Sequence, residues 1–132
     1  MTEQAKIRDL SAAGSSDIAQ SIAEILNGHK IKDLTVLRVD DKTVLTDYFV
    51  ICTCSSSTQV RALAAEIEYK LSLCGVKMWN MDGYSEGNWA VIDFGCVMVH
   101  IFSRETRDFY KLDKLWADAE KIDLTSIQNE SD

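Results

Sequence analysis

Two stretches of the chain repeat apolar residues at the three- and four-residue spacing of a helix that packs on one side. The first stretch follows Ser16 or Asp17, either of which can cap a helix, and it ends at Gly28. The second follows the polar residues 55–58 and ends at Gly75, a residue suited to a left-handed helix end. The apolar positions are Ile18, Ile22, Ile25 and Leu26 in the first stretch, and Val60, Leu63, Ala64, Ile67 and Leu71 in the second.

Shorter apolar runs, rich in β-branched residues, lie between and after these stretches and predict strands. The continuous apolar run at residues 48–53 is typical of a strand that is covered on both faces. The order helix, two strands, helix, three strands, helix predicts an α/β fold with a mixed, about five-stranded sheet and packed helices. The predicted strands are residues 34–39, 48–53, 76–81, 89–94 and 97–102, and helical stretches follow from about Arg104 to Ile122.

The last two predicted strands form a hairpin around Gly95 and Cys96. Glycine at the first of two turn residues is the pattern of a type II′ turn, which sets the register of the flanking strands. One face of the hairpin is then wholly apolar and belongs to the core; it carries Ala90, Ile92, Phe94, Val97, Val99 and Ile101. The opposite face pairs Trp89 with Phe102, Val91 with His100, and Asp93 with Met98.

This opposite face combines large apolar side chains with an acid and an imidazole, and it has two interpretations. The mixture resembles the centre of a protein interface, where aromatic residues and methionine are enriched. Alternatively, the last predicted helix covers the face, because helices commonly cover both sides of a mixed sheet. That helix would use Phe109, Leu112, Leu115 and Trp116. The sequence leaves both interpretations open.

The size and composition of the chain indicate one globular domain. It has 132 residues, of which 46% are hydrophobic and 27% charged. These are enough apolar residues to form a core that needs no disulfide bonds or structural metal. We expect a flexible segment at residues 1–14, one α/β domain at 15–122 and a flexible acidic tail at 123–132. No apolar run approaches the roughly 20 residues of a membrane span, and no secretory leader is evident. The four cysteines are therefore expected to be reduced thiols in a cytoplasmic protein, or in the mature form of an organellar one.

The charge of the chain narrows the class of partner. Fourteen Lys and Arg against 21 Asp and Glu give a net charge of −7. Such a surface repels the phosphates of nucleic acids and anionic lipids, and it attracts basic proteins. We expect no strong direct binding to nucleic acid and no membrane partner.

Candidate chemistry is sparse. The four cysteines and the two histidines lack the paired spacing of a zinc site, and no third group marks Cys54 and His100 as a nucleophile pair. The serines after residue 54 suit helix capping better than phosphate binding, because no Asp-x-Asp pair stands in a strand to hold a metal. The sequence predicts no cofactor, no metal and no catalytic residue. A basic stripe formed by Arg104, Arg107, Lys111 and Lys114 is expected to be a solvated helix face.

Seven segments, in order and at similar spacing, together resemble the Iojap family, whose bacterial members are called ribosomal silencing factors. The resemblance runs over residues 16–119 and is far more specific than any single motif. The segments are TDYFVI at 46–51, SSSTQV at 55–60, DGY at 82–84, WAVIDFG at 89–95, VMVHIF at 97–102, ETRDFY at 105–110 and LDKLW at 112–116.

The resemblance implies a fold related in outline to nucleotidyltransferases but without their catalytic carboxylates. It implies a translational repressor that binds the large ribosomal subunit through the basic ribosomal protein numbered fourteen. Occupying that site blocks association with the small subunit, so no enzymatic step is needed. The resemblance also implies a homodimer. The alternatives are a large-subunit assembly factor that uses the same interface and, less favoured, a nucleotidyltransferase-like enzyme that uses the serine-rich turn.

Charge, the hairpin and the resemblance together define the predicted partner-binding residues. Trp89 is the expected anchor, and acidic residues are expected to meet Lys or Arg of the partner. His100 either contacts the partner or holds the hairpin in place. The predicted set is Asp82, Tyr84, Glu86, Trp89, Val91, Asp93, Met98, His100 and Phe102.

Overall fold

A computed structural model describes residues 9–104 and 119–123 of the chain. It confirms the α/β fold class, with a mixed sheet and helices packed on it, but the sheet has six strands where about five were predicted. The helices are α2 (Ser15–Asn27) and α3 (Ser57–Leu73). The strands are β1 (Lys32–Arg38), β2 (Tyr48–Cys54), β3 (Asn80–Asp82), β4 (Trp89–Asp93), β5 (Val97–Ser103) and β6 (Glu120–Lys121).

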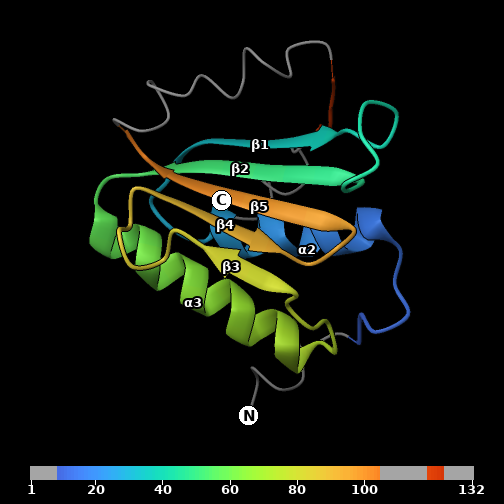
Figure 1. Cartoon of the computed structure of the whole chain (residues 1–132), viewed down its shortest axis with the longest axis horizontal. Coiled ribbons are helices and arrows are strands. Elements are labelled where there is room, and N and C mark those ends of the chain that lie inside the picture. The colour runs from blue at the N-terminus through green and yellow to red at the C-terminus, as the bar shows by residue number, and fades with distance from the viewer. Residues whose placement is uncertain (1–8, 105–118, 124–132) are drawn as a thin grey trace.

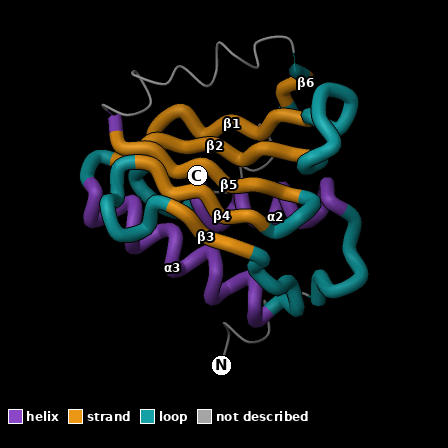
Figure 2. The backbone as a smooth tube through the Cα atoms, in the orientation of Figure 1, coloured by secondary structure: helices purple, strands orange, loops and turns teal. Residues whose placement is uncertain are grey.

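The strands lie in the order β3-β4-β5-β2-β1-β6. Strands β2 and β5, at the centre, run parallel, and every other neighbouring pair is antiparallel. Helices α2 and α3 lie together on one side of this sheet (Figures 1 and 2). The two faces of the sheet therefore lie in different environments, because only one of them is covered by α2 and α3.

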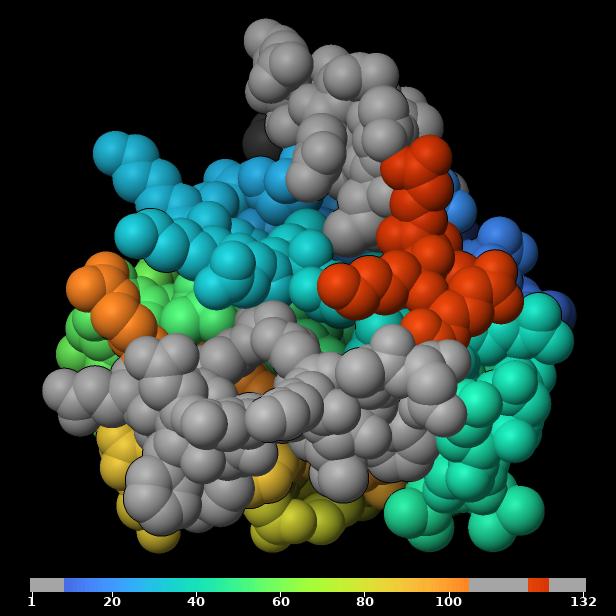
Figure 3. Space-filling model, turned by 90° about the horizontal axis from the view of Figure 1, so that it is seen from above, coloured from blue at the N-terminus to red at the C-terminus, as the bar shows by residue number. Residues whose placement is uncertain are grey.

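Strand β6 corrects the prediction of helical stretches up to Ile122. Glu120 pairs with Arg38 and Lys121 pairs with Leu37, so the chain returns to the free edge of β1 as a strand. Residues 119–123, red in Figure 3, lie against β1 and the loop that follows it. Edge strands offer unpaired backbone groups to any segment that reaches them, and helical periodicity does not reveal this. The part of the helical prediction at residues 105–118 lies outside the described residues.

The helix ends agree with the predictions from the local sequence, with one exception. The N-cap of α2 is Gly14 and makes no side-chain cap, so the predicted capping by Ser16 or Asp17 is wrong. Helix α3 begins as predicted, because the Ser56 hydroxyl accepts a hydrogen bond from the Gln59 backbone N–H at 3.1 Å. It ends in a left-handed turn at Gly75, whose φ is +87°.

The third predicted strand is also shorter than its apolar pattern suggested. Of residues 76–81, only Asn80 and Met81 belong to β3, and Val76 is buried at the end of α3 instead. The Val76 N–H donates to the Leu71 carbonyl at 2.9 Å, which completes the helix ending. Val76 therefore packs beneath the helix end, and pairing with β4 begins only at Asn80.

The main core lies between the sheet and the two helices. All the predicted apolar positions of the hairpin's inner face are buried there. Leu10, upstream of α2, also packs in this core and donates its N–H to the Cys74 carbonyl at 2.7 Å. The domain boundaries at residues 14 and 122 remain predictions. Within the described part of the chain, no helix combines the length and the apolar content that crossing a bilayer requires.

Candidate functional site

The hairpin of β4 and β5 adopts the predicted register. The pairs on its outer side are Trp89 with Phe102, Val91 with His100, and Asp93 with Met98. The turn is closed by the Phe94 N–H, which donates to the Val97 carbonyl at 2.9 Å. Gly95 has the left-handed φ of +87° that the first position of a type II′ turn requires. The Asp93 carboxylate accepts the Gly95 N–H at 2.7 Å, so this acid also holds the turn.

Side chains alternate along strands, so the residues between the core positions of β2, β4 and β5 point away from the helices. We call this side the second face; it carries Phe49, Ile51, Trp89, Val91, Asp93, Met98, His100 and Phe102. Its centre is a separate apolar cluster of Leu37, Val39, Phe49, Ile51, Phe102 and Ala119, against which Trp89 and Met98 pack. The second face is therefore partly a small core of its own.

Burial divides the predicted partner-binding residues into three groups. Phe102 is 0% exposed and His100 is 6% exposed, so neither offers much surface to a partner. Four residues are half-buried: Trp89, Val91, Asp93 and Met98. Three residues are exposed: Asp82, Tyr84 and Glu86. The accessible part of the second face thus runs from the half-buried hairpin residues to the exposed loop between β3 and β4.

Trp89 stands at the centre of an aromatic cluster. Its indole stacks on Phe102, with ring centroids 5.0 Å apart and planes inclined by 21°. The indole N–H donates a hydrogen bond to Nδ1 of His100 at 3.2 Å. The edge of Phe49 meets the His100 ring at a centroid distance of 4.8 Å. The stacking on Phe102 and the hydrogen bond to His100 together fix the position of the indole.

His100 is neutral in this environment. Burial lowers the pKa of its imidazole from 6.5 to about 4, because the surrounding rings cannot solvate a charge. A neutral imidazole has one acceptor nitrogen, and here that acceptor is used by Trp89. At neutral pH His100 therefore acts as a hydrogen-bond acceptor and not as an ion.

The loop between β3 and β4 is held close to Trp89 by glycine. Gly83 has a φ of +78°, and a Cβ built there would overlap the Trp89 carbonyl oxygen. The Arg61 guanidinium of α3 donates to the Ser85 carbonyl at 3.3 Å and ties the loop to the helix. The loop that follows Asp82 is thus fixed beside the hairpin, and the carboxylates of Asp82, at the end of β3, and of Glu86, in the loop, are exposed.

Two residues near this surface escaped the sequence prediction. Trp79 is 75% exposed and its ring lies against Gly95, at the hairpin turn. A tryptophan between Met78 and the polar Asn80, just before the loop, is the signal that could have marked it. Phe49 supports His100 from β2, but its strand reads as a continuous apolar run, so its side could not be assigned from periodicity.

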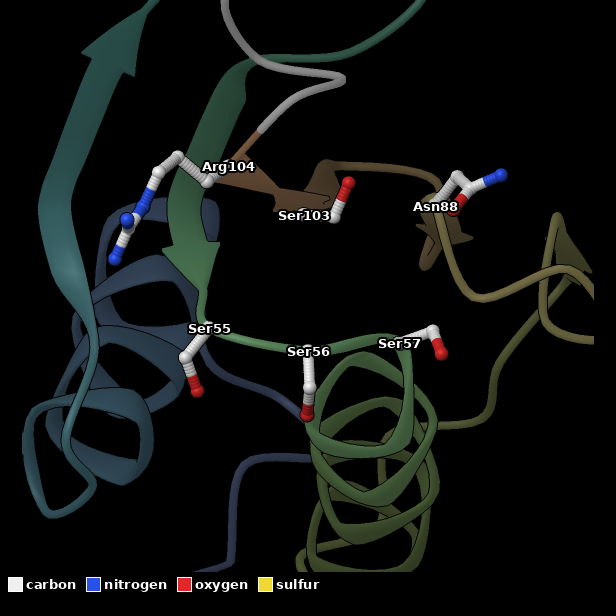
Figure 4. Close-up of a pocket in the computed structure, with 6 residues that line it drawn as sticks. All are labelled: Ser55, Ser56, Ser57, Asn88, Ser103 and Arg104. Atoms are coloured by element: carbon white, nitrogen blue, oxygen red, sulfur yellow. The ribbon is translucent and has the colours of Figure 1, made fainter.

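A pocket of about 330 Å³ lies at the ends of β2 and β5, beside the start of α3 (Figure 4). It is lined by Ser55, Ser56, Ser57, Asn88, Ser103 and Arg104. In Figure 4 the side chains of Asn88 and Arg104 point away from this space, and the Ser56 hydroxyl already caps α3. The lining contains no carboxylate that could hold a catalytic metal.

The other candidate chemistry does not assemble in the described residues. Cys52 and Cys54 are buried on the side of the helices, whereas His100 lies on the second face, so a Cys54–His100 pair cannot form. The Cys52 thiol hydrogen-bonds to Cys54 and lowers its pKa. Within residues 9–104 and 119–123, no group of three His, Cys, Asp or Glu residues is placed to hold a metal. Of the predicted basic stripe only Arg104 is described, and it is exposed.

Comparison with known proteins gives a consistent result. Residues 12–132 match the sequence model of a family described as "Ribosomal silencing factor during starvation", RsfS. The ribosomal silencing factor RsfS of Bacillus subtilis is 34% identical over 113 residues, which cover 86% of this chain and 96% of that protein. A mouse protein named "Mitochondrial assembly of ribosomal large subunit protein 1" is 31% identical over 101 residues; the match spans 72% of this chain and 43% of the mouse protein.

The fold is also similar to solved structures. A crystal structure of a Chromobacterium violaceum protein superimposes with a TM-score of 0.69 and 32% sequence identity. The match covers 78% of this chain and 83% of that protein. The arrangement of two helices on a mixed sheet is therefore shared with an experimentally determined relative.

Proposed function

Because the chain belongs to the RsfS family of non-enzymatic, ribosome-associated silencing factors, we propose that it represses translation by docking its second face on the large ribosomal subunit. The contact is a basic protein of that subunit, ribosomal protein fourteen. The bound molecule then blocks association with the small subunit by its volume alone. This mechanism requires a docking surface and no catalytic group.

The observation that carries this proposal is the half-buried Trp89 on the hairpin, preceded in the chain by two exposed carboxylates. Tryptophan is among the residues most often responsible for binding energy at interfaces, because its large ring fills a partner pocket. The two carboxylates belong to Asp82, at the end of β3 opposite Val91, and to Glu86, in the loop before β4, and the whole chain has a net charge of −7. Complementary charge speeds the encounter with a basic protein and disfavours anionic partners.

For Phe102 we propose a supporting role in place of the predicted contact, and for His100 the second of its two predicted roles, that of holding the hairpin in place. Both are buried, so in the proposed complex they support Trp89 from below and do not form the contact. The contacting set then consists of Trp89, Val91, Asp93 and Met98 on the hairpin, Asp82 at the end of β3, and Tyr84 and Glu86 on the loop.

Subunit joining on sucrose gradients tests the proposal. Purified large and small subunits are mixed with an excess of the protein, and the fraction that joins is measured. We expect the wild-type protein to reduce joining and Trp89→Ala to weaken its effect by about thirtyfold in concentration, a typical loss for a central interface tryptophan.

Tyr69→Ala is the matched control, because Tyr69 is an aromatic residue that is 61% exposed on α3, on the helix side of the sheet. It should leave the block intact. Unchanged subunit joining in the presence of excess wild-type protein would rule out the proposed mechanism. Equal weakening by both variants would place the contact elsewhere.

A second function, assembly of the large subunit, is favoured by the name of the mouse relative. An assembly factor could use the same second face on an immature particle. The two functions differ in their target: a silencing factor binds mature large subunits, whereas an assembly factor binds precursors preferentially. Cosedimentation with mature subunits and with precursor particles distinguishes them.

Three further expectations belong with this proposal. We propose a homodimer, which light scattering during size-exclusion chromatography can check. We also propose a cytoplasmic location, since relatives include bacterial proteins, although the mouse relative is named for mitochondria. Direct binding to nucleic acid is expected to be weak because of the net negative charge.

A further inference from the structure

The contact between Trp89 and His100 is more specific than packing requires. Trp89 sits directly opposite Phe102 in the hairpin, whereas His100 is its diagonal neighbour. The indole lies over Phe102 with a centroid distance of 5.0 Å, and its N–H is directed at His100 Nδ1. Stacking alone leaves a ring free to slide, while the added hydrogen bond fixes its direction.

This hydrogen bond also determines which nitrogen of His100 carries the proton. Nδ1 accepts from the indole, so the proton of the neutral ring must lie on Nε2. Nε2 is buried and has no hydrogen-bond partner among the described residues. A buried donor without a partner is unfavourable, so the aromatic cluster retains His100 at a cost that phenylalanine or leucine would not incur.

The surroundings of His100 add rigidity. The Phe49 edge meets the imidazole at 4.8 Å, and the Phe102 ring lies nearly parallel to it at 6.2 Å. The imidazole is 6% exposed, so it cannot turn away without disturbing both rings. The acceptor atom is therefore held at one position, and Trp89 is held by it.

We propose that His100 is a positioning residue, which acts through Trp89 by holding the indole in the orientation that docks on the ribosomal partner. The proposal rests on the proposed function of the second face. A side chain that is already ordered loses less freedom on binding, so a preoriented tryptophan binds more tightly than a mobile one with the same contacts. His100 itself need not touch the partner.

Three substitutions of His100 test the role of the acceptor. His100→Asn places an amide oxygen near the position of Nδ1, whereas His100→Leu removes the acceptor. We expect His100→Leu to weaken binding to purified large subunits by about five- to tenfold and His100→Asn to stay within about twofold. His100→Gln is the second control: it is polar and foldable like Asn, but its longer side chain carries the oxygen past the Nδ1 position, so it should behave like Leu.

A measurement without the partner checks the mechanism directly. The indole N–H signals of the full chain are recorded by NMR, and the Trp89 signal is identified by its loss in Trp89→Phe. We expect this N–H to exchange with solvent about tenfold faster in His100→Leu and His100→Gln than in wild type and His100→Asn, because a broken hydrogen bond exposes the proton.

The outcomes separate the two proposals. If Trp89→Ala abolishes binding but His100→Leu, His100→Asn and His100→Gln all bind like wild type, the positioning role is wrong and the docking face stands. If Trp89→Ala binds like wild type, the docking face itself is wrong. If Asn weakens binding as much as Leu and Gln do, while all three fold, the imidazole acts by packing and not as an acceptor.

Discussion

The two faces of the sheet are built from different kinds of side chain. The helix face packs aliphatic residues such as Ile92, Val99 and Ile101, all fully buried under α2 and α3. The second face packs aromatic rings around an imidazole and leaves Trp89, Val91, Asp93 and Met98 half-buried. Aliphatic side chains fill space without directional needs, whereas indole and imidazole need partners in defined directions.

Under the proposed function, the sheet divides stability and recognition between its two sides. The helix face needs only to exclude water, and its residues could be exchanged for others of similar volume. On the second face, polar atoms form hydrogen bonds with specific partners. One of them is the Asp93 carboxylate, which closes the hairpin turn. We therefore expect changes on the helix face to affect folding most, and changes on the second face to affect binding most.

The largest expected effect is the loss of a side chain from the helix face. Ile101→Ala should lower the free energy of unfolding by about 4 kcal/mol, because it removes a fully buried side chain and leaves a cavity. Met98→Ala, on the half-buried second face, should cost about 1 kcal/mol. Urea unfolding followed by circular dichroism measures both. Equal losses would mean that the two faces contribute equally to the core.

The pH dependence of the free energy of unfolding tests the burial of His100 on the second face. The folded pKa of His100 lies near 4, below its ordinary 6.5, so the unfolded chain takes up the proton first as the pH falls. The resulting stability is complete above pH 6.5 and is lost between pH 6.5 and 4. Wild type should lose on the order of 3 kcal/mol more than His100→Phe over this range. Parallel curves for the two proteins would show that His100 is not buried as a neutral ring.

A smaller effect is expected from the loop that borders the second face. Gly83→Ala should cost about 2 kcal/mol, because its φ of +78° disfavours a side chain and a Cβ meets the Trp89 carbonyl. Gly28→Ala is the control, since its φ is ordinary and its nearest contact is 3.4 Å away. It should change thermal stability by less than about 0.5 kcal/mol. A tolerant Gly83 would mean that the loop does not need its close approach to β4.

The smallest effect concerns charge. Glu86→Gln should slow association with large subunits by about twofold at low salt, and the difference should disappear at high salt, because exposed charges steer encounter and are screened. Glu68→Gln removes a charge that is also exposed, from α3 on the other side of the sheet, and should leave the rate unchanged. Equal slowing by both would indicate steering by net charge alone.

Features that depend on neighbours in sequence were predicted well, with the N-cap of α2 as the exception. The hairpin register follows from a two-residue turn at Gly95 and Cys96, and every predicted cross-strand pair is present. The cap at Ser56 and the left-handed turn at Gly75 depend on a few adjacent residues in the same way. Short-range chemistry of this kind has few alternatives, so it can be read without the rest of the molecule.

Features that depend on distant residues were predicted less well. Strand β6 exists because Glu120 and Lys121 reach the free edge of β1, more than eighty residues earlier in the chain. The burial of His100 depends on Phe49, which β5 meets only through its parallel pairing with β2. The exposed position of Trp79 likewise depends on the hairpin turn against which it lies.

The sequence alone determined the α/β class, the hairpin, the acidic character and the family resemblance, because each rests on composition or on local pattern. Only the tertiary structure decided which residues of the second face are buried and which are partly exposed. Periodicity states that a side chain points to one side of a strand, but burial depends on what other strands bring to that side. Phe102 and Trp89 are paired in the same hairpin and point the same way, yet one is buried and the other half-exposed.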